Sequence, residues 1–122
     1  MVSPSVAEFC QATFGIELND ADAREHIALS IADLGRLHFE DHGGELLIYL
    51  ARDVVPGDDR LRLQRGALRA VHEQHVGAQP VQVGMRGNEL VFVARLDARE
   101  AARNDLEDTV ELLAELQAQA RE

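Results

Sequence analysis

Residues 46–50, Leu-Leu-Ile-Tyr-Leu, constrain the fold of this chain more than any other stretch of its sequence. An extended segment alternates between two faces, and this one is apolar on both. Such a segment predicts a strand in the middle of a sheet, covered on both sides. The segments at residues 26–32 and 37–40 alternate apolar and polar residues, and His-Gly-Gly-Glu at 42–45 supplies the residues of a tight hairpin. Three consecutive strands are therefore expected.

A second hairpin follows further along the chain. Residues 81–86 alternate, Gly87-Asn88 is a turn sequence, and residues 90–94 are again apolar on both faces. The spacing of apolar residues predicts three helices around these strands. The first has Ser3 or Ser5 as its cap and Gly15 as its stop.

The second predicted helix begins after Asp58 or Asp59 and runs to about Val76, with Gly77 as its stop. The last begins at a capping box of Asp97 and Glu100 and runs to about residue 120. The order is α-β-β-β-α-β-β-α, which predicts an α+β fold with three helices and a five-stranded, mainly antiparallel, twisted sheet. A length of 122 residues fits one domain over residues 1–122.

Charge and cysteine content exclude several classes of function. The formal net charge is −10, so nucleic acids and anionic membranes would repel the chain. The single cysteine allows no internal disulfide and fits a reducing compartment, so we expect a cytoplasmic protein. No apolar stretch is long enough to insert into a membrane, and the first residues lack the features of a signal peptide.

Residues that carry chemistry are few. Cys10 shares a helix face with Phe9 and Phe14, where a buried, unreactive thiol is expected. His72 and His75 have a spacing of three, not the four of the zinc motif, and lack carboxylate partners. The carboxylates near the C-terminus lie on a helix, which favours a solvated face over calcium binding. We therefore expect no catalytic residue, no metal and no cofactor. An enzyme that uses Cys10 and the two histidines is kept as an alternative hypothesis.

The second helix carries apolar residues around more than half of its circumference, which is more than one sheet can cover. Gly66, Ala67 and Ala70 are small enough for another backbone to approach closely. That backbone belongs either to a partner subunit or to the chain's own core, and the sequence leaves both open. Because large exposed apolar patches are rare in monomers, the excess favours a binding protein over an enzyme.

In element order and acidity the chain resembles the class I type III secretion chaperones. Short stretches make the resemblance to the SycN branch: Phe-Cys-Gln at 9–11, Leu-His-Phe-Glu at 37–40, His-Gly at 42–43, Leu-Ala-Arg at 50–52 and Leu-Asp at 96–97. The resemblance implies a cytoplasmic chaperone that holds the N-terminal region of a secreted substrate in an export-competent state. For this branch it implies a second small chaperone of the YscB type as partner and a gatekeeper of the YopN type as client.

Class I relatives dimerise through the second helix and the fourth strand. Carried over to this chain, that implies an interface of Leu61, Leu68, Val71, Val81, Val83 and Met85. By the same analogy the client contacts are Phe9, Ile27, Leu29, Ile31 and Leu47. The dimer contains either two copies of this chain or two different chains. The alternative function is a regulator that sequesters another soluble protein through the same fold.

Overall fold

A computed structural model describes residues 4–18, 26–73 and 80–121. Its elements are α1 (Pro4–Phe14), β1 (His26–Ile31), β2 (Gly35–His42), β3 (Glu45–Asp53), α2 (Arg60–Glu73), β4 (Val81–Arg86), β5 (Glu89–Asp97) and α3 (Arg103–Ala120). This order confirms the predicted fold class. No helix within the described residues is long and apolar enough to cross a membrane.

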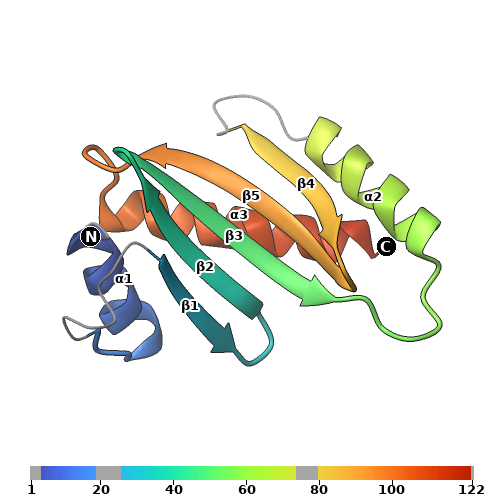
Figure 1. Cartoon of the computed structure of the whole chain (residues 1–122), viewed down its shortest axis with the longest axis horizontal. Helices are drawn as coiled ribbons and strands as arrows, with labels where there is room; N and C mark the ends of the chain where they lie inside the picture. The colour runs from blue at the N-terminus through green and yellow to red at the C-terminus, as the bar shows by residue number, and fades with distance from the viewer. Residues whose placement is uncertain (1–3, 19–25, 74–79, 122) are drawn as a thin grey trace.

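The five strands form one antiparallel sheet in the order β1-β2-β3-β5-β4, with β1 and β4 at its edges. The central position predicted for β3 is confirmed. Leu46, Ile48 and Leu50 on one face of β3 are fully buried, whereas Leu47 and Tyr49 on the other are only half-buried. The prediction that β3 is covered on both sides was therefore wrong, because the helices all lie against the same face of the sheet (Figure 1).

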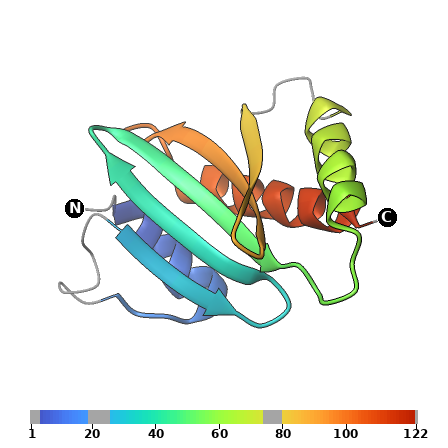
Figure 2. The ribbon, with the colours of Figure 1, turned by 45° about the vertical axis from the view of Figure 1, so that its right-hand side comes forward.

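α3 runs along the helical face of the sheet and contacts β3 and β5, with α1 and α2 at its two ends (Figures 1 and 2). Gln117 fixes α3 to the sheet, since its buried side-chain amide donates to the carbonyl oxygens of Leu50, at 2.9 Å, and Leu90, at 2.8 Å. On α1, the ring of Phe9 packs edge-on against that of Phe39, with ring centres 5.9 Å apart. The core therefore lies between one sheet face and the helices.

The ends of the first two helices largely follow the sequence signals. Asp59 caps α2, because its side chain accepts the backbone N–H of Arg62 at 3.1 Å. Gly15 ends α1 at a φ of 69°, where an L side chain would be strained. Ser5 is not the cap of α1, since the helix already includes Pro4. Ser3, Gly77 and His75 lie outside the described residues.

The last helix begins later than predicted. Asp97 is still part of β5, where it pairs with Glu45, and its carboxylate accepts the N–H of Arg99 in the turn that follows. α3 starts only after Ala102, whose N–H donates to the Asp105 carboxylate at 2.9 Å. The capping box predicted at Asp97 and Glu100 was wrong, because the strand pairing continues through Asp97.

The small residues of α2 serve the chain's own core. A Cβ at Gly66 would lie 2.5 Å from the carbonyl oxygen of Ala120, so the backbones of α2 and α3 meet at this glycine. Ala67 and Ala70 are buried. Of the two readings that the sequence left open for these residues, the structure supports close packing within the chain.

Candidate protein-binding surfaces

Two leucines of α2 lie far from the core. Leu61 and Leu68 are 55% and 62% exposed, and because they are seven residues apart they share one face of the helix. The buried residues of α2 occupy a different side. A single exposed leucine is ordinary, but two on one helix face beside further apolar side chains form a patch.

The patch continues from α2 onto the edge strand β4. Val83 and Met85 are half-buried, and together with Ala67 and Leu68 they line a hollow of about 160 Å³ between the two elements. Val71 is also half-buried. We call the set Leu61, Leu68, Val71, Val83 and Met85 the α2–β4 surface. Val81, the sixth residue of the implied dimer interface, is 8% exposed and belongs to the core.

An apolar groove of about 380 Å³ lies at the other edge of the sheet, between α1, α3 and the turn after β1. Phe14 packs edge-on against Phe9, with ring centres 5.6 Å apart, and both line the groove. Three exposed carboxylates line it as well, from Asp33, Glu107 and Glu111. This α1–β1 groove, completed by Ile31, Leu34, Val110 and Ala114, is therefore apolar within and acidic at its margin.

The structure does not bring the five implied client residues together. Phe9 and Ile31 both line the α1–β1 groove, although Phe9 is almost fully buried; Leu29 is half-buried and Ile27 is almost fully buried. Leu47 lies on the opposite face, paired with Glu40 and Arg95. Sequence reasoning missed the roles of Leu34 and Val110. The signal for Val110 was its spacing of four from Leu106 and three from Leu113 on the last helix.

The face of the sheet without helices carries polar and aromatic side chains. Tyr49 donates its hydroxyl to Glu40 at 2.7 Å, and burial together with this carboxylate raises the pKa of Tyr49 to about 12. His38 lies beside His26 and Tyr49, and burial, followed by the charge of His26, lowers its pKa. These residues line a trough of about 410 Å³ that reaches Gln82 and Arg86 on β4.

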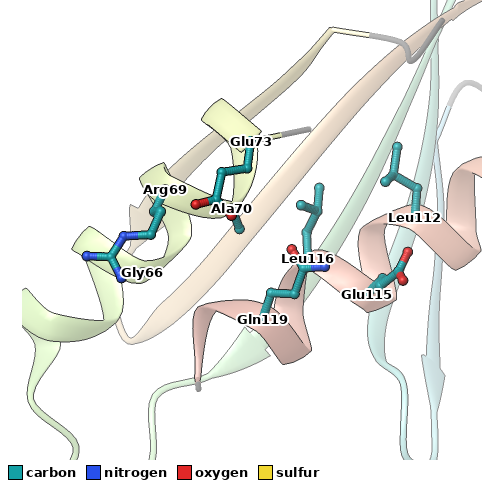
Figure 3. A pocket seen from close by; sticks show the side chains of 8 residues that line it. All are labelled: Gly66, Arg69, Ala70, Glu73, Leu112, Glu115, Leu116 and Gln119. Atoms are coloured by element: carbon teal, nitrogen blue, oxygen red, sulfur yellow. The ribbon is translucent and has the colours of Figure 1, made fainter. Parts of the chain in front are cut away.

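A further hollow of about 500 Å³ lies between α2 and α3 (Figure 3). Arg69 and Glu73 of α2 face Glu115 and Gln119 of α3 across a floor that includes Leu112 and Leu116. Its mixed charges and open form favour no particular ligand.

Cys10 and His72, the two described residues among the groups considered for catalysis, lie on different helices, α1 and α2. Cys10 is buried, and burial raises the pKa of its thiol to about 11, which keeps it protonated. His72 is exposed on α2. Within the described ranges no three His, Cys, Asp or Glu side chains gather as metal ligands would. The α2–β4 surface and the α1–β1 groove are therefore the main apolar candidate sites among the described residues.

Solved structures with this fold include type III secretion chaperones. The chain matches a structure of the ExoU–SpcU complex from the type III secretion system of Pseudomonas aeruginosa with a TM-score of 0.68, at 18% identity over 94% of this chain and 93% of that one. It matches the Yersinia pestis chaperone SycH, solved with a fragment of YscM2, with a TM-score of 0.61, at 16% identity over 96% of this chain and 95% of that one. These likenesses show the fold of a secretion chaperone.

The sequence comparisons identify the family. Residues 1–120 match the family of the type III secretory system chaperone SycN. The chain is also 31% identical over 117 residues to the chaperone protein SycN of Yersinia enterocolitica, which covers 95% of this chain and 93% of the relative. The chain therefore belongs to the SycN family of type III secretion chaperones, as the sequence resemblance predicted.

Proposed function

We propose that this chain is one subunit of a dimeric, cytoplasmic chaperone that binds the N-terminal region of a YopN-type gatekeeper and keeps it competent for export. The observation that carries the proposal is the exposure of Leu61 and Leu68 on the side of α2 that faces away from the core. Family membership supports the chaperone role. The partner and the client are our proposals.

The α2–β4 surface is the proposed contact between subunits. Burying the exposed parts of Leu61 and Leu68 contributes about 1 kcal/mol each, and the half-buried Val83 and Met85 extend the apolar area. α2 as a whole is basic, because it carries four arginines and a single acidic residue, Glu73.

The basic charge of α2 favours two different chains over two copies. A symmetric dimer places the same patch of both subunits face to face, so it would bring two basic helices together. A second small chaperone of the YscB type with carboxylates around an apolar patch would meet the arginines with opposite charge. We therefore propose a heterodimer.

The α1–β1 groove is the proposed site for the client. Its apolar lining fits a leucine- or isoleucine-sized side chain, and the carboxylates of Asp33, Glu107 and Glu111 favour basic residues beside that anchor. β1 is an edge strand, so an extended client segment can also add to the sheet there. We expect the bound segment to combine apolar anchors with nearby Lys or Arg.

Co-expression tests the dimer. We expect this chain, a YscB-type partner and the N-terminal fragment of a YopN-type gatekeeper to elute as one complex whose mass, by light scattering, is the sum of the three chains. Leu68→Asp places a charge in the apolar contact and should prevent the pair from forming at micromolar concentration. Val55→Asp is the matched control, because Val55 is 59% exposed but lies outside the α2–β4 surface.

Two results would contradict the proposal. Elution of the wild-type chains as separate species would reject the complex, and assembly of Leu68→Asp as tight as that of the wild type would reject this interface. A stable pair that ignores the gatekeeper fragment but retains another soluble regulatory protein would favour the sequestering regulator.

A further inference from the structure

Two imidazoles meet on the sheet face opposite the described helices. Nε2 of His26 on β1 lies 3.1 Å from Nδ1 of His38 on β2, and the two ring planes differ by 18°. At this distance one ring donates an N–H and the other accepts it with a bare nitrogen. The bond therefore requires that at least one of the two rings is neutral.

We propose that the His26–His38 pair is a pH-sensitive clasp that holds the edge strand β1 against β2, and that protonation of both rings releases it. When both rings are charged, both facing nitrogens carry hydrogen, so the bond is lost and two positive charges adjoin. This inference concerns the chain by itself and does not depend on the proposed client or partner.

The surroundings of His38 disfavour the charged form of its ring. Burial is the largest cause that lowers its pKa, and the charges of His26, of Arg86 on β4 and of Arg36 on β2 act in the same direction, whereas Glu89 on β5 opposes them. Nε2 of His38 is buried and has no hydrogen-bond partner in the part of the chain that the structure describes. The charged His38 ring carries an N–H at this nitrogen, and that N–H has no acceptor among the described residues, which is costly away from water.

Three other polar side chains near the pair, Glu40, Tyr49 and His42, interact with one another. Glu40 on β2 accepts the hydroxyl of Tyr49 on β3 at 2.7 Å, and its other oxygen lies 3.4 Å from Nε2 of His42. The Glu40 carboxylate is therefore shared between Tyr49 and His42 and does not bond to either ring of the pair in this arrangement.

The pair adds a side-chain contact to β1, an edge strand whose six residues all pair with β2. On the sheet face that the helices cover, β1 supplies Ile27 to the core and Ile31 to the α1–β1 groove. Loosening β1 therefore alters this groove. The α2–β4 surface lies at the opposite edge of the sheet and should not respond.

The direction of the pH effect follows from the lowered pKa of His38. Because the folded chain releases this proton more readily than the unfolded chain, unfolding takes up a proton as the pH falls below the ordinary value of 6.5. The contribution to stability is complete above pH 6.5 and decreases below it, until the folded pKa is reached. β1 should loosen in the same range.

Hydrogen exchange on the full-length chain tests the clasp. After correction for intrinsic rates, we expect the β1 amides to lose protection between pH 7.5 and 5.5 by a factor of ten or more, while those of β3 and β5 change little. His38→Gln, which stays neutral, should reduce this acid effect at least threefold. His72→Gln is the matched control, because His72 is exposed on α2, and it should retain the full effect.

The variant His26→Gln gives a second test if His38→Gln does not fold. Removing the charge of His26 should raise the pH at which the His38 ring titrates by NMR, because that charge lowers the pKa of His38. Unchanged titration of His38 in this variant, or equal β1 protection of the wild type at pH 7.5 and 5.5, would overturn the proposal.

Discussion

At the scale of single residues, Gly66 decides how closely two helices approach. Its position in the middle of α2 is unfavourable for helix formation, since glycine costs up to about 1 kcal/mol relative to alanine there. The contact with the backbone of Ala120 explains why glycine occupies the site. The requirement comes from Ala120 at the end of α3, more than fifty residues further along the chain, so no pattern in the sequence near Gly66 indicates it.

Gly66→Ala should therefore destabilise the protein in spite of its better helix propensity. A Cβ placed 2.5 Å from the Ala120 oxygen forces α2 and α3 apart, and we expect the free energy of unfolding to fall by about 1–3 kcal/mol in urea titrations. Gly84→Ala on β4 is the control, because a Cβ there meets no atom within 4 Å. Equal stability of Gly66→Ala and wild type would show that the helix crossing is looser than described.

At the scale of elements, the start of α3 shows how a strand competes with a helix for the same residues. Asp97 and Glu100 have the types and spacing of a capping box, yet Asp97 remains in β5 because its backbone pairs with Glu45. The helix begins at the next place where a carboxylate can reach a free N–H, through Asp105. Local signals therefore predicted that a helix follows β5, while strand pairing decided where it begins.

Asp105→Ala should lower the free energy of unfolding by about 1 kcal/mol. It removes the bond to the N–H of Ala102 and a negative charge from the first turn, where the helix dipole favours one. Asp108→Ala is the control from the next turn, where the side chain is exposed, and it should change stability by less than about 0.5 kcal/mol. The comparison is made by urea titration, and equal effects of the two substitutions would contradict the assigned cap.

At the scale of the whole molecule, the proposed dimer contact and the proposed client groove lie at opposite edges of one sheet. β4 and α2 form one, while β1, α1 and the facing side of α3 form the other. Three strands separate them, so no side chain that lines the α1–β1 groove also belongs to the α2–β4 surface. We therefore expect the two binding events to respond to different substitutions.

Phe14→Asp tests this separation. A charge in the apolar groove should weaken binding of the gatekeeper fragment at least tenfold, by calorimetry, while the pair with the YscB-type partner still forms. Leu68→Asp should have the opposite effect: it should weaken binding of the YscB-type partner and leave the α1–β1 groove unchanged. Loss of partner binding in a correctly folded Phe14→Asp protein would show that the two surfaces are one.

The sequence by itself determined the element order, the central place of β3, the family and the excess of apolar residues on α2. Each of these depends on residues close together along the chain: the alternation within a strand, the turn at Gly43 and Gly44, and the helical spacing of Leu61 and Leu68. Such patterns need no knowledge of what lies opposite.

Only the tertiary structure decided which apolar residues remain at the surface. Ile27, Leu29 and Ile31 are alike in type and alternate along β1, yet Ile27 is almost fully buried in the core, whereas Ile31 stays at the margin and lines the groove. The same holds for Gly66 against Ala120 and for His26 against His38, pairs that meet only when distant segments pack. Burial depends on the neighbour that covers a residue, and the fold supplies that neighbour from elsewhere in the chain.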